Sequence, residues 1–240
     1  RERGVEGFDD RLEHGRAGIL HELQRRHAAF GVDQLRYYLM REMGYKVMPG
    51  DKVTFQGKPV KPQKKVYILL NKPTVYITTT NDERNRWTVM ELVKHATTER
   101  VYPVGRLDRN TTGLLLFTND GELAQELAHP SRKVQKVYSV ELDKPLTANH
   151  FEQILEGVKL EEGAAAVDDL AFPEPNNKHL VGIALHIGWN RVVRRIFEKL
   201  GYKVKKLDRV VYAGLTKKDL PRGKYRFLKD KEVIRLKHCN

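Results

Sequence analysis

The part of this sequence best suited to chemistry is a loop in which an acidic side chain lies between basic ones. Asp108 lies between Arg106 and Arg109, and Gly105 and Gly113 flank the group. Neighbouring guanidinium groups keep a carboxylate ionised, and an ionised carboxylate held in one place can attack an electrophilic carbon. A lone loop aspartate is more often a turn former that bonds to its own backbone. The interpretation of Asp108 therefore depends on the elements around its loop.

The segment directly after this loop predicts a buried strand. Residues 114–117 are Leu, Leu, Leu and Phe, bounded by Gly113 and by the turn signal of residues 119–121. A short apolar run between turn residues favours a core strand over a helix. Because a rigid strand fixes the loop before it, we expect Asp108 to be held at the mouth of a sheet.

The remaining patterns predict strands and helices that do not alternate regularly. Thr88 and Glu91 have capping-box spacing and should open a short helix. Further strands are expected at residues 66–70, 137–142, 180–185, 203–212 and 224–228. Further helices are expected at residues 122–128, 147–156 and 190–200. This order predicts an α+β fold, with a mainly antiparallel or mixed sheet flanked by helices.

The first 65 residues differ in composition and hydrophobic pattern from the rest of the chain. Residues 1–48 are rich in Arg, Gly and His and have helical patches, such as residues 19–23, without a sustained amphipathic face. They predict an atypical appendage that is helical or partly disordered. Residues 49–65 alternate like short strands between turns and end in a basic, proline-containing linker. The main domain is expected at residues 66–240.

The composition favours a nucleic-acid partner. Lys and Arg number 44 against 31 Asp and Glu, a formal charge of +13, and such an excess indicates a polyanion or an acidic membrane surface. No apolar run approaches the roughly 20 residues that span a membrane. The one cysteine, Cys239, rules out an internal disulfide, and nothing resembles a signal peptide, so a cytoplasmic location is expected. No histidine or cysteine spacing is typical of a metal site.

Taken as a whole, residues 105–121 resemble the RLD motif of the pseudouridine synthases, in the branch containing RsuA and RluB that modifies ribosomal RNA. Residues 183–197 resemble the third motif of that family, a strand ending in glycine and followed by a helix with Val-Arg-Arg. Residues 71–73, Asn-Lys-Pro, resemble the first motif. The resemblance covers roughly residues 66–230 and implies the family's catalytic fold. Residues 49–65 also resemble the closing strands of an S4 RNA-binding module.

The resemblance implies an isomerase that converts uridine to pseudouridine without a cofactor or metal. Asp108 would be the nucleophilic or charge-stabilising carboxylate, acting on the sugar or on the base. By position, Arg194 would pair with Asp108, since a guanidinium can hold a carboxylate bidentately. Tyr138 lies in a Lys-x-Tyr strand and would stack on the target base, worth about 1–3 kcal/mol, and could accept the C5 proton.

Five further side chains are expected to contact substrate or RNA. Arg106 would hold the loop and neighbouring phosphates, and Arg195 would lie on a solvated helix face that touches phosphates. Leu185 would form a floor under the uracil, although core packing explains it almost as well. Lys72 and Lys136 are also expected to contact the substrate or the RNA. Other basic residues are expected to form a surface that binds the RNA backbone, among them Arg132, Lys133, Lys203, Arg209, Lys217 and Arg222.

The RNA target and two alternative functions remain open at this point. Residues 110–124 and 129–131 look closest to the RluB type, which implies large-subunit (23S) ribosomal RNA, with the small-subunit (16S) RNA of the RsuA type as the nearest rival. Ile187 and Val192 stand where the family usually has an acid and a glutamine. We expect a monomer. The alternatives are an RNA-binding ribosome-assembly factor and a glycoside hydrolase that pairs Asp108 with Asp120.

Overall fold

The computed structural model of the protein describes residues 21–25, 36–40, 53–55, 58–59 and 63–238. The chain divides into two compact units, residues 1–63 and 64–240. In the first unit, β1 (His21–Arg25) pairs antiparallel with β2 (Arg36–Met40), and β3 (Thr54–Phe55) pairs antiparallel with β4 (Lys58–Pro59). The helical patch expected at residues 19–23 is therefore wrong in its described part, which is a strand. The other predictions for residues 1–48 fall largely outside the described residues.

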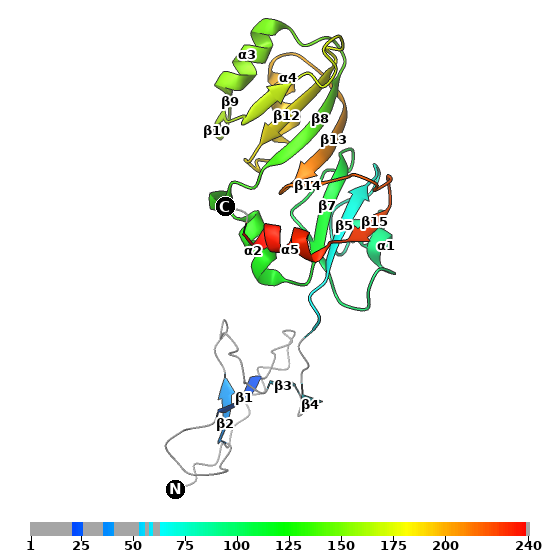
Figure 1. The fold of residues 1–240 in the computed structure, drawn as a ribbon, viewed down its shortest axis with the longest axis vertical. Coiled ribbons are helices and arrows are strands. Elements are labelled where there is room, and N and C mark those ends of the chain that lie inside the picture. The colour runs from blue at the N-terminus through cyan, green and yellow to red at the C-terminus, as the bar shows by residue number, and fades with distance from the viewer. Residues whose placement is uncertain (1–20, 26–35, 41–52, 56–57, 60–62, 239–240) are drawn as a thin grey trace. The chain divides into compact units, whose positions relative to one another are not determined.

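The second unit is built on one large mixed sheet (Figure 1). Its strands run in the order β11-β12-β8-β13-β7-β5-β15, with β14 on β13 and β6 on β7. All of these pairings are antiparallel except that of β13 with β7. The strands are β5 (Tyr67–Lys72), β6 (Tyr102–Val104), β7 (Thr112–Thr118), β8 (Lys136–Leu142), β11 (Asp169–Ala171), β12 (Leu180–Leu185), β13 (Val204–Tyr212), β14 (Leu215–Thr216) and β15 (Tyr225–Phe227). The predicted α+β fold is confirmed.

The helices and one small hairpin surround this sheet. The helices are α1 (Val89–Val93), α2 (Gly121–Ala128), the 3-10 turn η2 (Pro130–Arg132), α3 (Ala148–Glu156), α4 (Val192–Lys199) and α5 (Asp230–Lys237). The hairpin joins β9 (Val158–Leu160) to β10 (Gly163–Ala165). The predicted capping box is confirmed, since the Thr88 backbone N–H donates to Glu91 Oε1 at 2.9 Å. None of the helices described is long and apolar enough to cross a membrane.

The strand after the Asp108 loop is apolar from residue 114 to residue 117 because both of its faces are covered. Successive side chains of a strand point to opposite faces of its sheet. Leu115 and Phe117 pack into a cluster with α1, whereas Leu114 and Leu116 pack into a cluster with α2 and α5. These four side chains are fully buried. Helices α2 and α5 lie side by side over their face of the sheet (Figure 1).

The two halves of the sheet meet where β13 runs parallel to β7. A separate cluster beneath α3 and α4 forms the core of the other half, with β8 and β12. At the junction Arg209 is in register with Gly113. A Cβ atom on Gly113 would lie 2.3 Å from the Arg209 backbone oxygen, and Gly113 has φ +109. Only glycine allows this close backbone approach.

Candidate active site

The loop between β6 and β7, which we call the Asp108 loop (residues 105–111), is held by its backbone. The Thr78 hydroxyl donates to the Leu107 carbonyl at 2.8 Å, and the Leu107 N–H lies 3.2 Å from the same hydroxyl oxygen. The Val75 N–H donates to the Arg109 carbonyl at 3.0 Å. The loop is thereby tied to the segment that follows β5.

Lys72, at the end of β5, holds the same loop from beneath. Its side chain is fully buried, and its ammonium donates to the carbonyls of Asp108 at 3.0 Å, Thr111 at 2.8 Å and Pro73 at 3.1 Å. Burial lowers the pKa of Lys72 to about 8, and the charge of Asp108 opposes that shift. The expected RNA contact of Lys72 is wrong, because its ammonium is enclosed by the loop that it supports.

Replacing Lys72 by methionine is expected to loosen the Asp108 loop. Three carbonyls lose a charged donor, so the free energy of unfolding should fall by about 1–3 kcal/mol. Amide hydrogen exchange of residues 107–112 should accelerate about 10-fold or more, because these bonds protect the loop from local opening. Lys136→Met is the matched control: its ammonium also binds two carbonyls, of Val134 and His186. Equal exchange in the loop for both variants would contradict this role.

Arg194 reaches the Asp108 loop in a different way from the one expected. In the described part of the chain it forms no ion pair with Asp108. Its Nη2 donates to the Asn110 carbonyl at 3.1 Å and its Nη1 to the Val204 carbonyl at 3.0 Å. Burial and then the charge of Arg191 lower the pKa of Arg194, while the charge of Asp108 opposes them. The predicted pairing is corrected: Arg194 positions the loop backbone of Asp108.

The Asp108 carboxylate itself faces a cleft. Half-buried, it receives no hydrogen bond from any described residue, although every loop carbonyl from residue 107 to 111 has a donor. The cleft has a volume of about 510 Å³. Residues 106–109 form one of its walls, and residues of the segment 77–86 form the other. A rigid loop that leaves its carboxylate oxygens free is suited to chemistry on a bound molecule.

Tyr138 lies in β8, next to the junction between the two halves of the sheet. Its register partners are Ile183 of β12 and Arg209 of β13. The ring is half-buried and packs against the cluster beneath α3 and α4 as well as the cluster with α1. Its stacking role stays a prediction. Leu185 is 1 % exposed within the first of these clusters, so its core-packing interpretation accounts for its position.

Two of the cations expected to bind RNA have partners within the protein. Lys136 donates to the carbonyls of Val134 at 3.0 Å and His186 at 2.8 Å, and burial followed by the charge of Arg209 lowers its pKa to about 8. Arg195 makes a bidentate pair with Glu162, at 2.7 and 2.6 Å. The expected RNA contact of Lys136 is corrected, because its ammonium binds backbone carbonyls. The Arg195 side chain is 23 % exposed, so its phosphate contact stays a prediction. Arg106 is exposed on the cleft wall.

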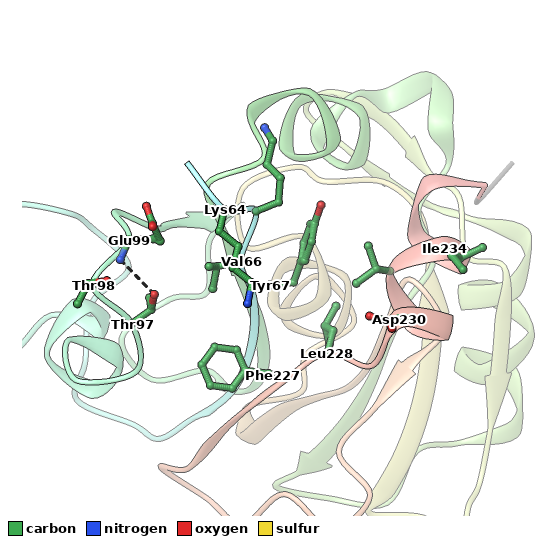
Figure 2. Close-up of a pocket in the computed structure, with 12 residues that line it drawn as sticks. Lys64, Val66, Tyr67, Thr97, Thr98, Glu99, Phe227, Leu228, Asp230 and Ile234 are labelled. Carbon is green, nitrogen blue, oxygen red and sulfur yellow. Dashed lines mark hydrogen bonds between the residues drawn. The ribbon is translucent and has the colours of Figure 1, made fainter. Parts of the chain in front are cut away.

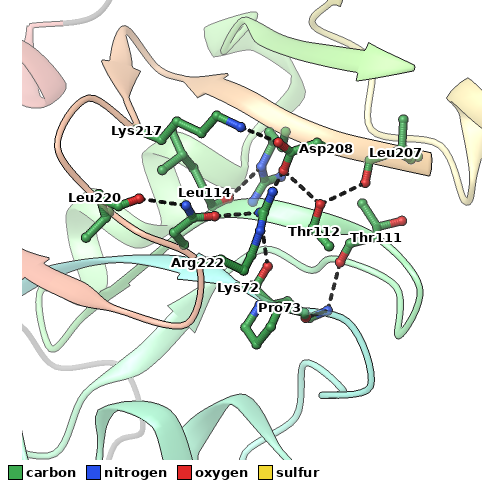
Figure 3. Close-up of polar contacts among 12 residues, drawn as sticks. Lys72, Pro73, Thr111, Thr112, Leu114, Leu207, Asp208, Lys217, Leu220 and Arg222 are labelled. Atoms are coloured by element: carbon green, nitrogen blue, oxygen red, sulfur yellow. Dashed lines mark hydrogen bonds and ion pairs between the residues drawn. The ribbon is translucent and has the colours of Figure 1, made fainter. Parts of the chain in front are cut away.

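A polar network behind the loop joins four segments of the chain (Figure 3). Asp208 of β13 accepts hydrogen bonds from the Thr112 hydroxyl at 2.8 Å, from Arg222 at 2.8 Å and from Lys217. Arg222 also donates to the Asn71 side-chain oxygen at 2.6 Å. Burial by itself would raise the pKa of Asp208, but the hydrogen bonds from Arg222, Lys217 and Thr112 outweigh it and lower the pKa to about 2. The network thus fixes the start of β7.

Asp208→Asn is expected to destabilise the protein in a pH-dependent way. Because the folded pKa is about 2 and the ordinary value is 3.8, the carboxylate contributes stability above about pH 4 and loses it as the pH falls towards 2. At pH 7 the loss should be roughly 2 kcal/mol. Urea unfolding of both proteins from pH 7 to 3 measures it, with the exposed Asp219→Asn as control. A difference that stays constant below pH 4 would contradict this role.

A further cation, Arg209, is buried against β7. Arg209 is 3 % exposed; its Nε donates to the Leu114 carbonyl at 2.7 Å, and its guanidinium lies 4.7 Å from the centre of the Tyr212 ring. Lys72, Arg194 and Arg209 are thus three buried cations, and the charge of Arg209 acts on Lys72. Assignment of Arg209 to the surface was therefore wrong. Buried cations attract an anionic substrate more strongly than exposed ones.

A second cleft lies at the other end of β5 (Figure 2). It has a volume of about 640 Å³, and Tyr67, Phe227 and Ile234 are among its lining residues. The Tyr67 hydroxyl donates to Asp120 at 2.6 Å, and burial followed by this bond raises the pKa of Tyr67. No residue of the Asp108 loop lines this cleft, so it is not the site of that chemistry.

The position of Asp120 excludes the glycoside hydrolase alternative. Asp108 precedes β7 and Asp120 follows it, so seven strand residues separate them. At about 3.3 Å per residue the two carboxylates lie roughly 20 Å apart, whereas a hydrolase pair needs about 5–10 Å. Asp120 serves instead as an acceptor for Tyr67 and Lys65.

The fold and the site define an enzyme with a free carboxylate on a rigid loop in a cleft lined with arginines, a class that includes enzymes acting on RNA. The family model described as RNA pseudouridylate synthase matches residues 66–199, more than half of the chain. The chain belongs to this family. It is a pseudouridine synthase, an isomerase, as its motifs predicted.

Curated relatives resemble the chain over most of its length. An uncharacterized RNA pseudouridine synthase of Aquifex aeolicus is 40% identical over 201 residues, covering 82% of this chain and 80% of the relative. The ribosomal large subunit pseudouridine synthase B of Bacillus subtilis is 36% identical over 202 residues, covering 83% and 82%. A crystal structure of a pseudouridylate synthase aligns with a TM-score of 0.64 at 24% identity, over 82% of this chain and 85% of that one. The similarity to this crystal structure is evidence for the fold alone.

Proposed function

We propose that the protein converts uridine to pseudouridine in ribosomal RNA, and specifically in large-subunit RNA. The observation that carries the proposal is the Asp108 loop, whose carbonyls from residue 107 to 111 are all bonded while its carboxylate stays free in a cleft with arginines. The large-subunit assignment is supported by the Bacillus subtilis relative. The proposal includes action as a monomer in the cytoplasm, where ribosomal RNA is found.

The reaction breaks the N1–C1′ bond of uridine, turns the detached uracil and joins its C5 to C1′. Because these atoms are enclosed in a stacked helix, the nucleotide must be flipped out of the helix to reach Asp108. Asp108 then acts as the nucleophilic or charge-stabilising carboxylate, and Tyr138 stacks on the uracil and accepts the C5 proton. Arg194 holds the loop through the Asn110 carbonyl, so the carboxylate is in place before the substrate arrives.

Phosphate contacts would come from the exposed arginines of the cleft. Arg84, Arg106 and Arg109 lie on its walls and have no carboxylate partner among the described residues. Each phosphate contact adds affinity without sequence choice and makes binding depend on salt. Together with the net charge of +13, this supports a nucleic-acid substrate.

Ribosomal RNA that lacks pseudouridine tests the proposal. The protein is incubated separately with large-subunit and small-subunit RNA from cells without their own synthases, and pseudouridine is mapped by chemical modification and primer extension. We expect modification of the large-subunit RNA. Modification of only the small-subunit RNA would show that the target uridine lies in that RNA instead. Tight binding with no modification of either RNA would reject catalysis and favour a role in ribosome assembly.

A further inference from the structure

An exposed tryptophan directly follows the segment that forms one wall of the cleft at Asp108. Trp87 is 59 % exposed, more than any other large hydrophobic residue described. It directly follows Arg86, which lines the cleft. A large exposed aromatic ring offers a flat apolar face on which a binding partner can stack. The proposed reaction at Asp108 does not involve the Trp87 ring.

The structure holds this tryptophan in a defined place. The Ile77 N–H donates to the Trp87 carbonyl at 2.9 Å, and the Val89 N–H donates to the Ile77 carbonyl at 3.0 Å. The ring meets the Tyr76 ring edge to face, with centroids 5.7 Å apart and planes at 84°. The indole is therefore anchored at the base of the segment 78–86 while most of its surface remains accessible.

The cleft next to Trp87 is lined by four arginines and three acids. Arg84 lies in the same segment and Arg106 on the opposite wall, both exposed and without a carboxylate partner in the described part of the chain. Arg86, by contrast, is paired with Asp82 at 2.6 Å. A protein partner would require an apolar surface around the ring, whereas an aromatic platform beside free arginines is the arrangement that binds single-stranded nucleic acid.

We propose that Trp87 is a stacking platform for an unpaired base next to the target uridine. The inference rests on the proposed function, since the target nucleotide occupies the cleft at Asp108. Arg84 and Arg106 then hold the phosphates on either side of the stacked base. Every base has a flat face, so Trp87 contributes affinity and holds the strand in register, without selecting the base.

Binding of a short single-stranded oligoribonucleotide, adenosines around one uridine, tests this platform. Trp87→Ala should weaken binding roughly 5- to 100-fold, and Trp87→Phe should retain most of the affinity, because a phenyl ring still stacks. The slope of log affinity against log salt should be unchanged in Trp87→Ala and fall by about one in Arg84→Ala. Equal affinities of Trp87→Ala and the wild type, or no binding by the wild type, would overturn the proposal.

Fluorescence reports stacking directly, because the chain has two tryptophans, Trp87 and Trp189. In the Trp189→Phe protein the oligoribonucleotide should quench the remaining indole, and in the Trp87→Phe protein it should not. Quenching that is absent from Trp189→Phe would overturn the platform. This test can fail independently of the proposed function. If Trp87→Ala binds RNA normally and the wild type is active, only the platform is rejected. If RNA quenches Trp87 but the wild type is inactive, only catalysis is rejected.

Discussion

Asparagine in place of Asp108 is expected to reduce pseudouridine formation by roughly 10³-fold or more. The amide has the shape of the carboxylate but carries no charge and is a poor nucleophile. The loop should keep its conformation, because its anchors bind backbone carbonyls, among them those of Leu107 and Asn110. RNA affinity and the free energy of unfolding should therefore stay close to those of the wild type. Single-turnover assays with ribosomal RNA, filter binding and urea unfolding measure the three quantities.

Asp120→Asn is the matched control for this variant. Asp120 follows β7 at its far end and accepts a hydrogen bond from Tyr67 at 2.6 Å. Its replacement should lower stability while turnover is preserved. If Asp108→Asn retains more than a tenth of the activity, the assignment of Asp108 to the chemistry is refuted. If it also loses RNA binding or unfolds, Asp108 has a structural role instead.

Alanine in place of Gly113 is expected to destabilise the protein by about 3 kcal/mol or more. Its Cβ would lie 2.3 Å from the Arg209 carbonyl oxygen and 2.5 Å from the Arg209 nitrogen, and both are backbone atoms that cannot rotate away. The φ of +109 adds strain for any residue with a Cβ. Because Arg209 and Gly113 join the halves of the sheet, relief of the clash requires β7 and β13 to move apart.

Gly121→Ala provides the comparison for Gly113→Ala. Gly121 begins α2, and a Cβ there has no neighbour within 4 Å. Alanine should be neutral or slightly stabilising at that position. Urea unfolding of both variants gives the two differences, and circular dichroism shows whether Gly113→Ala folds at all. Similar stabilities for the two proteins would show that the sheet can adjust at its junction.

The elements that sequence predicted correctly are those specified by local chemistry. The strand at residues 114–117 follows from an apolar run between turn residues, and the start of α1 follows from the Thr88–Glu91 capping box. Helix α5 was not predicted, because its sequence is charged on most sides. Its position depends on the packing of α5 on the distant helix α2, and the pair of Glu232 with Arg226 at 2.7 Å holds its first turn.

The candidate site was predicted in outline but not in its contacts. Sequence pattern singled out Asp108, Tyr138 and Arg194, and the structure brings the Arg194 helix to the Asp108 loop. The sequence could not show that Arg194 binds a backbone carbonyl of the loop rather than the carboxylate of Asp108. A motif indicates which residues come close together, whereas the atoms that meet depend on the path of the whole backbone.

By itself the sequence determined the fold class, the family and the loop that carries Asp108, because these follow from local periodicity and from motif residues at fixed spacing. Only the tertiary structure decided which cations are buried. Lys72 and Arg209 look like any other basic residue in the sequence, yet they are 0 % and 3 % exposed. A charge can be buried only where other segments supply its partners, and those carbonyls lie 36 and 95 residues away in the chain.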